Sequence, residues 1–310
     1  MKAMVYDKAA CRFAMQEVAM PEPAKGEVLV RVHASSINAA DYRSLKLGIR
    51  AENGIYGADV AGTVVKLGEG VTRLAVGDAV QGDLALEGFG GFGECTTGPE
   101  ELFSKILSGV SFETAAATTL AGVTALQAFR LASMDLRGKR VLIIGASGGV
   151  GTFAVQLAKH YGAEVTGVTS ARNLEQARAI GAERVIDYHR EDALASGEQY
   201  DLILGVQGNT SPRAYKRALN KGGAAIVVGG ALNQVFKILV FGWLYSIGGK
   251  RVAMLAAKPN AKDTEELMRL VAAGTIRPVI EKVVPLEELD EAFRYVASGH
   301  ASGKVVVKVI

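Results

Sequence analysis

The sequence predicts an α/β protein of two domains, in which a parallel-sheet unit of the Rossmann type is inserted into a β-rich domain. The first indication is length, because a chain of 310 residues is longer than a domain with one hydrophobic core usually is and is typical of two domains. The second is a change of pattern, from short strands to alternating strands and helices and back to strands. The expected boundaries are 1–112 and 276–310 for the β-rich domain and 113–275 for the inserted unit.

The first part of the chain is expected to consist of short strands. Residues 27–34 alternate apolar and polar side chains, as a half-buried strand does. Strand-like segments at 60–67 and 77–80 follow, with a glycine turn at 68–70 between them. Short strands separated by glycine-rich turns are typical of a small barrel or sandwich.

The inserted unit is expected to alternate strands with helices. An Ala- and Leu-rich helix is predicted first, at 112–132. Strands are then predicted at 140–144, 164–169, 184–186, 201–206 and 224–228, with helices at 149–161 and 173–180. This alternation is typical of a parallel sheet wrapped by helices.

Composition excludes several classes of function. The net charge is +3, from 35 basic and 32 acidic residues, without a dense Lys/Arg run, so no nucleic-acid partner is expected. The most apolar stretch, 235–249, contains Lys237 and is too short to span a bilayer. Two cysteines, Cys11 and Cys95, make no disulfide framework, which indicates a reducing compartment, and we expect a cytoplasmic protein.

The sharpest motif is the turn at 145–151, Gly-Ala-Ser-Gly-Gly-Val-Gly. It follows an apolar strand and opens an amphipathic helix, so backbone N–H groups and the positive end of the helix dipole meet there. Ala146 replaces the first glycine of the pattern G-x-G-x-x-G, but the strand before and the helix after are the required context. The turn predicts a dinucleotide site, and the alternative is a glycine-rich turn without a ligand.

The end of the second strand of this unit favours NADPH over NADH. An Asp or Glu that binds the ribose hydroxyls is expected about 20 residues after the glycine turn in NAD sites. Here the strand ends at Thr169 and Ser170, and Glu175 comes only inside the next helix. Ser170 and Arg172 instead suit a 2′-phosphate, since a guanidinium offers several donors to phosphate oxygens. The alternative is that Arg172 is a solvated residue at a helix start.

Several segments together resemble one known family. The segments are Val30–Asn38, Asp41–Arg43, Gly57–Gly62, Val76–Asp78, Leu120–Ala125, the glycine turn, and Gly181 with Ala182. In their order and spacing the chain resembles the zinc-independent quinone oxidoreductases of the medium-chain dehydrogenase/reductase superfamily, over nearly its whole length. The resemblance implies a GroES-like substrate domain, a Rossmann domain, NADPH as cofactor, and a quinone, enone or similar activated carbonyl as substrate.

The resemblance also implies roles for individual residues. It places the cofactor against Ser147, Gly148, Gly149, Val150, Gly151, Thr169, Ser170, Arg172, Tyr188, Val206, Gln207, Gly229 and Gly230. It places Asn38, Asp41 and Tyr56 near the substrate. Zinc-dependent relatives carry metal ligands at three places where this chain has Asn38, Ala58 and a cysteine-free segment around Leu120, so no metal is expected.

Without a Lewis acid, hydrogen-bond donors must polarise the acceptor carbonyl, and the Asn38 amide and the Tyr56 hydroxyl are the candidates. Asp41 either serves catalysis or braces the backbone. Phe89 and Phe92 either form an apolar wall for a flat acceptor or anchor a loop.

Two rival functions stay open at this point. One is alcohol oxidation or enoyl-thioester reduction on the same scaffold, and the other is a catalytically silent NADPH-binding protein. The resemblance also suggests a homodimer that uses the strand 251–255 at the sheet edge. The apolar segment 235–249 is assigned to a dimer interface, the cleft or a partner surface without a choice among them.

Overall fold

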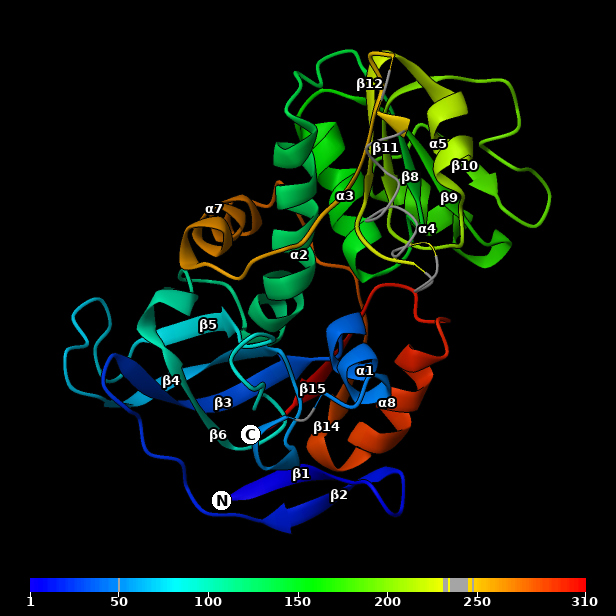
Figure 1. The fold of residues 1–310 in the computed structure, drawn as a ribbon. Helices are drawn as coiled ribbons and strands as arrows, with labels where there is room; N and C mark the ends of the chain where they lie inside the picture. Colours follow the sequence, from blue (N-terminus) through cyan, green and yellow to red (C-terminus); the bar gives the residue numbers. More distant parts are fainter. Residues whose placement is uncertain (50, 231–233, 235–244, 247) are drawn as a thin grey trace. The chain divides into compact units, whose positions relative to one another are not determined.

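The computed structural model describes residues 1–49, 51–230, 234, 245–246 and 248–310, and Figure 1 shows its ribbon. These residues form two compact units. Unit 1 comprises Met1–Val123 and Pro259–Ile310, and unit 2 comprises Thr124–Lys258. The inserted unit expected from the sequence, 113–275, is longer than unit 2 at both ends. The difference arises because helix α2 (Phe112–Ala132) begins in unit 1 and ends in unit 2, and because α7 (Ala261–Ala272) packs in unit 1.

Unit 1 is built on a sheet in the strand order β14-β15-β3-β4-β5-β7, with β6 paired to β3. The strands are β3 (Glu27–Ser36), β4 (Asp59–Leu67), β5 (Ala79–Asp83), β6 (Cys95–Pro99), β7 (Phe103–Lys105), β14 (Ile280–Pro285) and β15 (Lys304–Lys308). A separate antiparallel pair is formed by β1 (Lys2–Asp7) and β2 (Arg12–Glu17). The core of the sheet is made by alternating valines such as Val28, Val30 and Val32, as the sequence pattern predicts.

Short helices complete unit 1. They are α1 (Ala39–Lys46), α8 (Leu289–Ala297), and the 3₁₀ turns η1 (Glu52–Gly54), η2 (Glu100–Leu102) and η4 (Leu286–Glu288). Helix α7 packs against β7, and its Met268 joins Ala115, Ala116 and Ala117 of α2 in one buried cluster. Residues from both ends of the chain therefore share the cores of this unit.

Unit 2 is a parallel sheet in the strand order β10-β9-β8-β11-β12-β13. The strands are β8 (Arg140–Ile144), β9 (Glu164–Thr169), β10 (Arg184–Asp187), β11 (Tyr200–Gly205), β12 (Leu219–Val227) and β13 (Arg251–Met254). The helices α3 (Gly149–His160), α4 (Leu174–Ala179) and α5 (Pro212–Ala218), with the turn η3 (Ala171–Asn173), pack on these strands. In such a sheet, ligands bind at the carboxyl ends of the strands where the order reverses, here at β8 and β11.

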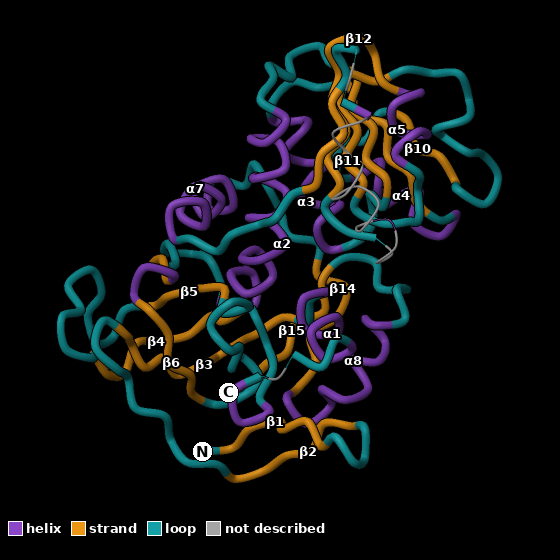
Figure 2. Tube along the Cα trace, viewed as in Figure 1, coloured by secondary structure: helices purple, strands orange, loops and turns teal. Residues whose placement is uncertain are grey.

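The strands of unit 2 read as continuous apolar runs because both faces of the sheet are covered. Val141, Leu142 and Ile143 of β8 are fully buried, and so is Leu202 of β11. The expected strands 140–144 and 164–169 have the observed bounds, whereas β12 begins five residues before the expected 224. Figure 2 shows the strands of both units in orange and the helices in purple.

The expected apolar segment 235–249 falls largely outside the described residues. None of the helices in the described part of the chain is long and apolar enough to cross a membrane.

Candidate active site

The glycine turn between β8 and α3 is shaped by close packing against β9. The backbone N–H groups of Gly145 and Ala146 both donate to the carbonyl of Val168 at 3.0 Å. A Cβ added to Gly151 would overlap the carbonyl oxygen of Gly145, so α3 reaches this turn only because residue 151 has no side chain. The last glycine of the motif therefore serves helix–strand packing, as expected for a dinucleotide turn.

Gly148, unlike Gly151, lies beside open space. It is the N-cap of α3, no side chain caps it, and a Cβ added to it would meet only the Gly145 carbonyl oxygen, at 3.7 Å. The first turn of α3 also contains no acidic residue. Open space above an uncapped helix N-terminus suits the pyrophosphate of a dinucleotide, because backbone N–H groups and the helix dipole both favour an anion there.

Ser147 connects this turn to the end of β9. Its Oγ accepts hydrogen bonds from the Thr169 hydroxyl at 2.6 Å and from the Asn173 Nδ2 at 3.1 Å. Since a hydroxyl accepts at most two such bonds, the Ser147 proton remains for donation to a third group. Asn173 was not singled out from the sequence, although an Asn at a helix start is a common capping residue and could have indicated it.

The ends of β9 and β10 form the part of the site expected to bind the adenosine end. Tyr188 follows β10, is 57% exposed, and donates its backbone N–H to Thr169 at 3.1 Å. Arg172 is exposed and makes no ion pair within the described residues. The neighbouring carboxylates already have partners: Glu175 pairs with Arg178, and Asp187 accepts the backbone N–H of His189 at 3.1 Å.

The loops after β11 and β12 carry the residues expected at the nicotinamide end. The N–H groups of Val206 and Gln207 donate to the Ile144 carbonyl at 3.0 and 3.2 Å. A Cβ added to Gly145 would lie 2.9 Å from the Gln207 Cβ, so Gln207 packs directly on the phosphate turn. Gly229 and Gly230 follow β12, the next strand of the sheet. Unit 2 thus brings all the expected cofactor residues to one edge of its sheet.

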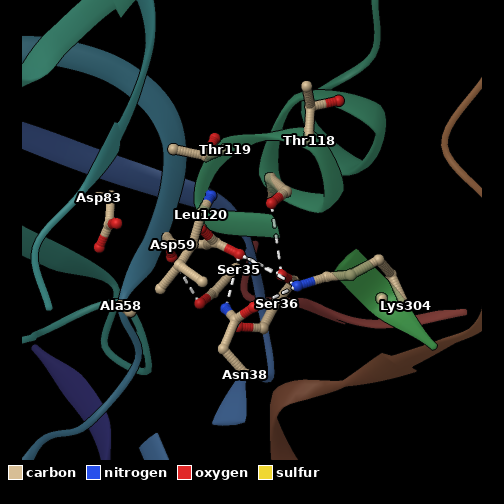
Figure 3. Close-up of polar contacts among 12 residues, drawn as sticks. Ser35, Ser36, Asn38, Ala58, Asp59, Asp83, Thr118, Thr119, Leu120 and Lys304 are labelled. Carbon is tan, nitrogen blue, oxygen red and sulfur yellow. Dashed lines mark hydrogen bonds and ion pairs between the residues drawn. The ribbon is translucent and has the colours of Figure 1, made fainter. Parts of the chain in front are cut away.

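Unit 1 contains a buried polar cluster around Lys304, which Figure 3 shows in detail. Lys304 is 2% exposed, and its ammonium contacts the Asn38 Oδ1 at 2.5 Å and the Asp59 Oδ2 at 3.4 Å. Asp59 also accepts the backbone N–H of Leu120 at 2.8 Å and the Ser36 hydroxyl. The cluster therefore joins β15, β3, β4 and α2, and it satisfies a carboxylate that would otherwise be costly to bury.

Asn38 is held inside this cluster. Its Oδ1 accepts from Lys304, and its Nδ2 donates to the Asp59 Oδ2 at 2.7 Å and to the Ser36 carbonyl at 3.1 Å. An amide nitrogen has only two protons, and both are used here. In this arrangement both amide protons brace the fold, and the role of Asn38 toward a substrate carbonyl stays a prediction.

Asp41 braces the backbone at the start of α1. Its carboxylate accepts the N–H groups of Asn38 at 2.7 Å, Gly57 at 3.2 Å and Ala58 at 3.0 Å. Burial raises the pKa of Asp41 to about 7, and the hydrogen bonds from Asn38 and Ala58 oppose that rise. Of the two expected roles, the backbone contacts favour bracing.

Tyr56, Phe89 and Phe92 lie in the hydrophobic core of unit 1. Their exposed fractions are 4%, 5% and 0%, and Tyr56 packs against Phe89 with ring centroids 5.4 Å apart. The Tyr56 hydroxyl donates to the Ile49 carbonyl at 2.8 Å, so its proton is already used. In this structure the three side chains anchor loops in a packed core, which is the second of the two roles expected for Phe89 and Phe92, and the donor role of Tyr56 stays a prediction.

Two family models and a relative of known name match this chain. A family described as "Alcohol dehydrogenase GroES-like domain" matches residues 24–131, and one described as "Zinc-binding dehydrogenase" matches residues 180–307. A "Chloroplast envelope quinone oxidoreductase homolog" of Arabidopsis thaliana is 33% identical over 311 residues, which cover 94% of this chain and 92% of that protein. The chain belongs to the quinone oxidoreductase family of the medium-chain dehydrogenases/reductases.

A solved structure has the same fold, and a further relative is similar in sequence. The structure of a quinone oxidoreductase from Coxiella burnetii superposes with a TM-score of 0.87 at 29% identity, covering 100% of this chain and 98% of that one. A further Arabidopsis thaliana relative, an "NADPH-dependent alkenal/one oxidoreductase, chloroplastic", is 30% identical over 305 residues, which cover 94% of this chain and 74% of that protein. The predicted fold class is confirmed, and the chain is an oxidoreductase of a family that binds a nicotinamide cofactor.

Proposed function

We propose that this oxidoreductase transfers hydride from NADPH to a quinone or an α,β-unsaturated carbonyl compound. The observation that carries the choice of NADPH is the end of β9, where Ser170 and the unpaired Arg172 stand and the nearby carboxylates have other partners. A guanidinium favours a 2′-phosphate, whereas a free carboxylate at this position would repel it. The names of the relatives, which include quinone, alkenal/one and trans-enoyl reductases, favour the acceptor class.

The residues of unit 2 would divide the binding of the cofactor among them. The first turn of α3, Gly149 to Gly151, donates backbone N–H groups to the pyrophosphate, and Ser147 directs its free proton to the same region. Thr169, Ser170 and Tyr188 surround the adenosine end, with Arg172 at the 2′-phosphate. When bound, NADPH supplies the hydride. The loops that carry Val206 and Gly229 set where the nicotinamide end rests.

We further propose that the reaction needs no zinc. The three positions at which zinc-dependent relatives have ligands hold Asn38, Ala58 and the segment at Leu120, none of which is a strong zinc ligand. The Lys304 ammonium beside Asn38 already supplies the counter-charge of the buried Asp59 carboxylate, so this carboxylate needs no metal cation. The described residues contain no group of His, Cys, Asp and Glu side chains that could hold a metal.

The absence of these ligands bears on the choice of substrate. Zinc stabilises a developing alkoxide by several kcal/mol. Quinones and enones spread the incoming charge over a conjugated oxyanion, so a few hydrogen bonds can suffice. An enone takes the hydride at its β-carbon and a proton from solvent at its α-carbon, whereas a quinone takes up the hydride and a solvent proton to become a hydroquinone. In both cases NADPH leaves as NADP⁺.

An acceptor panel tests the proposed function. NADPH oxidation is followed with a benzoquinone, a medium-chain enone and the matching saturated ketone, before and after prolonged treatment with a chelator. We expect turnover of the first two acceptors, little turnover of the ketone, and rates that the chelator leaves unchanged. Equal turnover of the saturated ketone, or loss of activity with one zinc per chain removed, would contradict the proposal. Tight NADPH binding without any turnover would favour a silent binding protein.

We also propose that the protein is located in the cytoplasm. Cys11 is exposed and free, and Cys95 is buried and free. Two unpaired thiols suit a reducing compartment such as the cytoplasm.

A further inference from the structure

A buried glutamine joins the two loops that are expected to carry the nicotinamide ring. Gln234 is 1% exposed. Its Oε1 accepts the backbone N–H of Thr210, in the loop after β11, and its Nε2 donates to the Gly229 carbonyl at 3.1 Å, in the loop after β12. One side chain therefore bridges the loop of Val206 and Gln207 to the loop of Gly229 and Gly230.

The two loops are closely packed beside this bridge. Gly230 has φ +111°, and a Cβ added to it would lie 2.6 Å from the Gly208 carbonyl oxygen and 2.8 Å from the Gln234 Nε2. Tyr215 is fully buried beneath β11, where a Cβ added to Gly205 would overlap its hydroxyl. The two loops are thus in close contact at Gly208, Gly230 and the Gln234 amide.

The amide also matches its two partners in polarity. Thr210 presents a donor and Gly229 presents an acceptor, so the bridging group must accept at one end and donate at the other. A carboxylate keeps the first bond but sets a negative charge against the Gly229 carbonyl. A thioether such as methionine has similar length and makes neither bond. Glutamine is therefore the residue type that satisfies both loops.

We infer that Gln234 is a positioning residue for hydride transfer, which fixes the spacing of the loops at the nicotinamide end without touching the reacting atoms. The inference rests on the proposed function, because it assigns the nicotinamide to these loops. Small errors in the placement of a reacting group lower rates steeply even when binding changes little. Loosening this bridge should therefore affect the nicotinamide end and spare the adenosine end, which is held by the phosphate turn and the end of β9.

The test compares Gln234→Glu and Gln234→Met with the unmodified protein. The measurements are kcat and KM with a benzoquinone, the Kd for NADPH, and the Kd for 2′,5′-ADP, which carries the 2′-phosphate but no nicotinamide. We expect kcat to fall at least tenfold in both variants, and the Kd for 2′,5′-ADP to stay within twofold. A tenfold fall corresponds to about 1.4 kcal/mol of barrier height.

A side-chain contact near the amino ends of the same two strands provides a matched control. Asn220, in β12, donates its Nδ2 to the Asp201 carboxylate of β11 at 3.0 Å. Asn220→Ala should lower the unfolding temperature while kcat and both Kd values stay unchanged. Two Gln234 variants are used because either one alone could fold poorly, and the unfolding temperature is recorded for each.

The outcomes separate the inference from the function on which it rests. Unchanged kcat in a folded Gln234 variant overturns the inference, and so does an equal weakening of NADPH and 2′,5′-ADP, which would indicate a merely structural role. If the unmodified protein neither binds nor oxidises NADPH, the proposed function fails and the inference fails with it. A fall in kcat with 2′,5′-ADP binding retained supports both.

Discussion

Arg172 is the single residue on which the choice of cofactor depends most. It is exposed at the end of β9, and its guanidinium has no ion-pair partner among the residues that the structure describes. A charge-assisted contact with phosphate is worth about 1.5–3 kcal/mol, so Arg172→Ala should reduce the preference for NADPH over NADH at least tenfold. The measurement is a titration with each cofactor.

Arg190 provides the control for this prediction. It lies after β10 and is paired with Asp187 at 3.7 Å, so Arg190→Ala should change the preference much less. Equal affinity of the unmodified protein for the two cofactors would refute the assignment of the 2′-phosphate to Arg172.

Gly148 and Gly151 make a second pair of predictions at the residue scale. Gly151→Ala would place a methyl group against the Gly145 carbonyl, which must push α3 away and cost about 1–3 kcal/mol of stability. Gly148→Ala has an ordinary φ of −79° and open space, so it should leave the unfolding temperature nearly unchanged and weaken cofactor binding. Thermal unfolding and NADPH titration distinguish the two effects. Normal binding by Gly148→Ala would mean that the pyrophosphate lies elsewhere.

The raised pKa of Asp83 leads us to expect a free energy of unfolding that depends on pH. Burial raises its pKa from 3.8 to about 8, and the negative charge of Asp59 adds to the rise. The folded protein therefore holds a proton that the unfolded chain loses near pH 4, and the stability gained from that proton is lost as pH rises through about 8. The free energy of unfolding should fall between about pH 4 and pH 8.

Asp83→Asn should remove most of this pH dependence, because an Asn side chain does not titrate. The variant should still fold, since Asn can also accept the backbone N–H of Ala85, which Asp83 accepts at 2.9 Å. Asp41, whose pKa is about 7 in the folded protein, keeps a smaller dependence of the same sign. Denaturant unfolding at several pH values provides the measurement. A variant with the same pH profile as the unmodified protein would contradict the assignment.

At the scale of elements, the Lys304 cluster holds β15 and β4 together. Lys304→Met would leave the Asp59 carboxylate buried without its counter-charge and should destabilise unit 1 by about 3–5 kcal/mol. The double variant Lys304→Met with Asp59→Asn should recover much of this loss, since no uncompensated charge then remains. A double-mutant cycle by urea unfolding measures the coupling. Additive losses would mean that the two side chains do not act as a pair.

At the scale of the whole molecule, we propose a homodimer that uses β13. This strand is the last in the sheet order of unit 2, and Val252 is buried against the core. An apolar edge strand favours pairing with another strand, and a symmetric dimer is the commonest way to complete it. Light scattering at micromolar concentration should give twice the mass of the 310-residue chain. A monomeric mass at that concentration would count against the proposal.

Local pattern was enough to predict most of unit 2. The strands at 140–144 and 164–169, the helix at 112–132 and the glycine turn were all predicted within a residue or two of their observed bounds. Their signals are apolar runs and glycine spacing, which act between residues close in sequence. The compact units divide the chain at positions other than the expected boundaries, and α2 continues from one unit into the other without a break in its pattern.

The sequence by itself determined the family, the parallel sheet and the place of the phosphate turn, since each depends on spacing over short stretches. Only the tertiary structure decided what the polar side chains of unit 1 do. Asn38 and Lys304 are 266 positions apart in sequence, yet the Asn38 Oδ1 accepts from Lys304, while the two amide protons expected to face a substrate go to Asp59 and Ser36. The Tyr56 hydroxyl likewise donates to the Ile49 carbonyl, and its ring is buried. The reason is physical: a side chain's free donors are those that remain after its neighbours in space, most of them distant in sequence, have been satisfied.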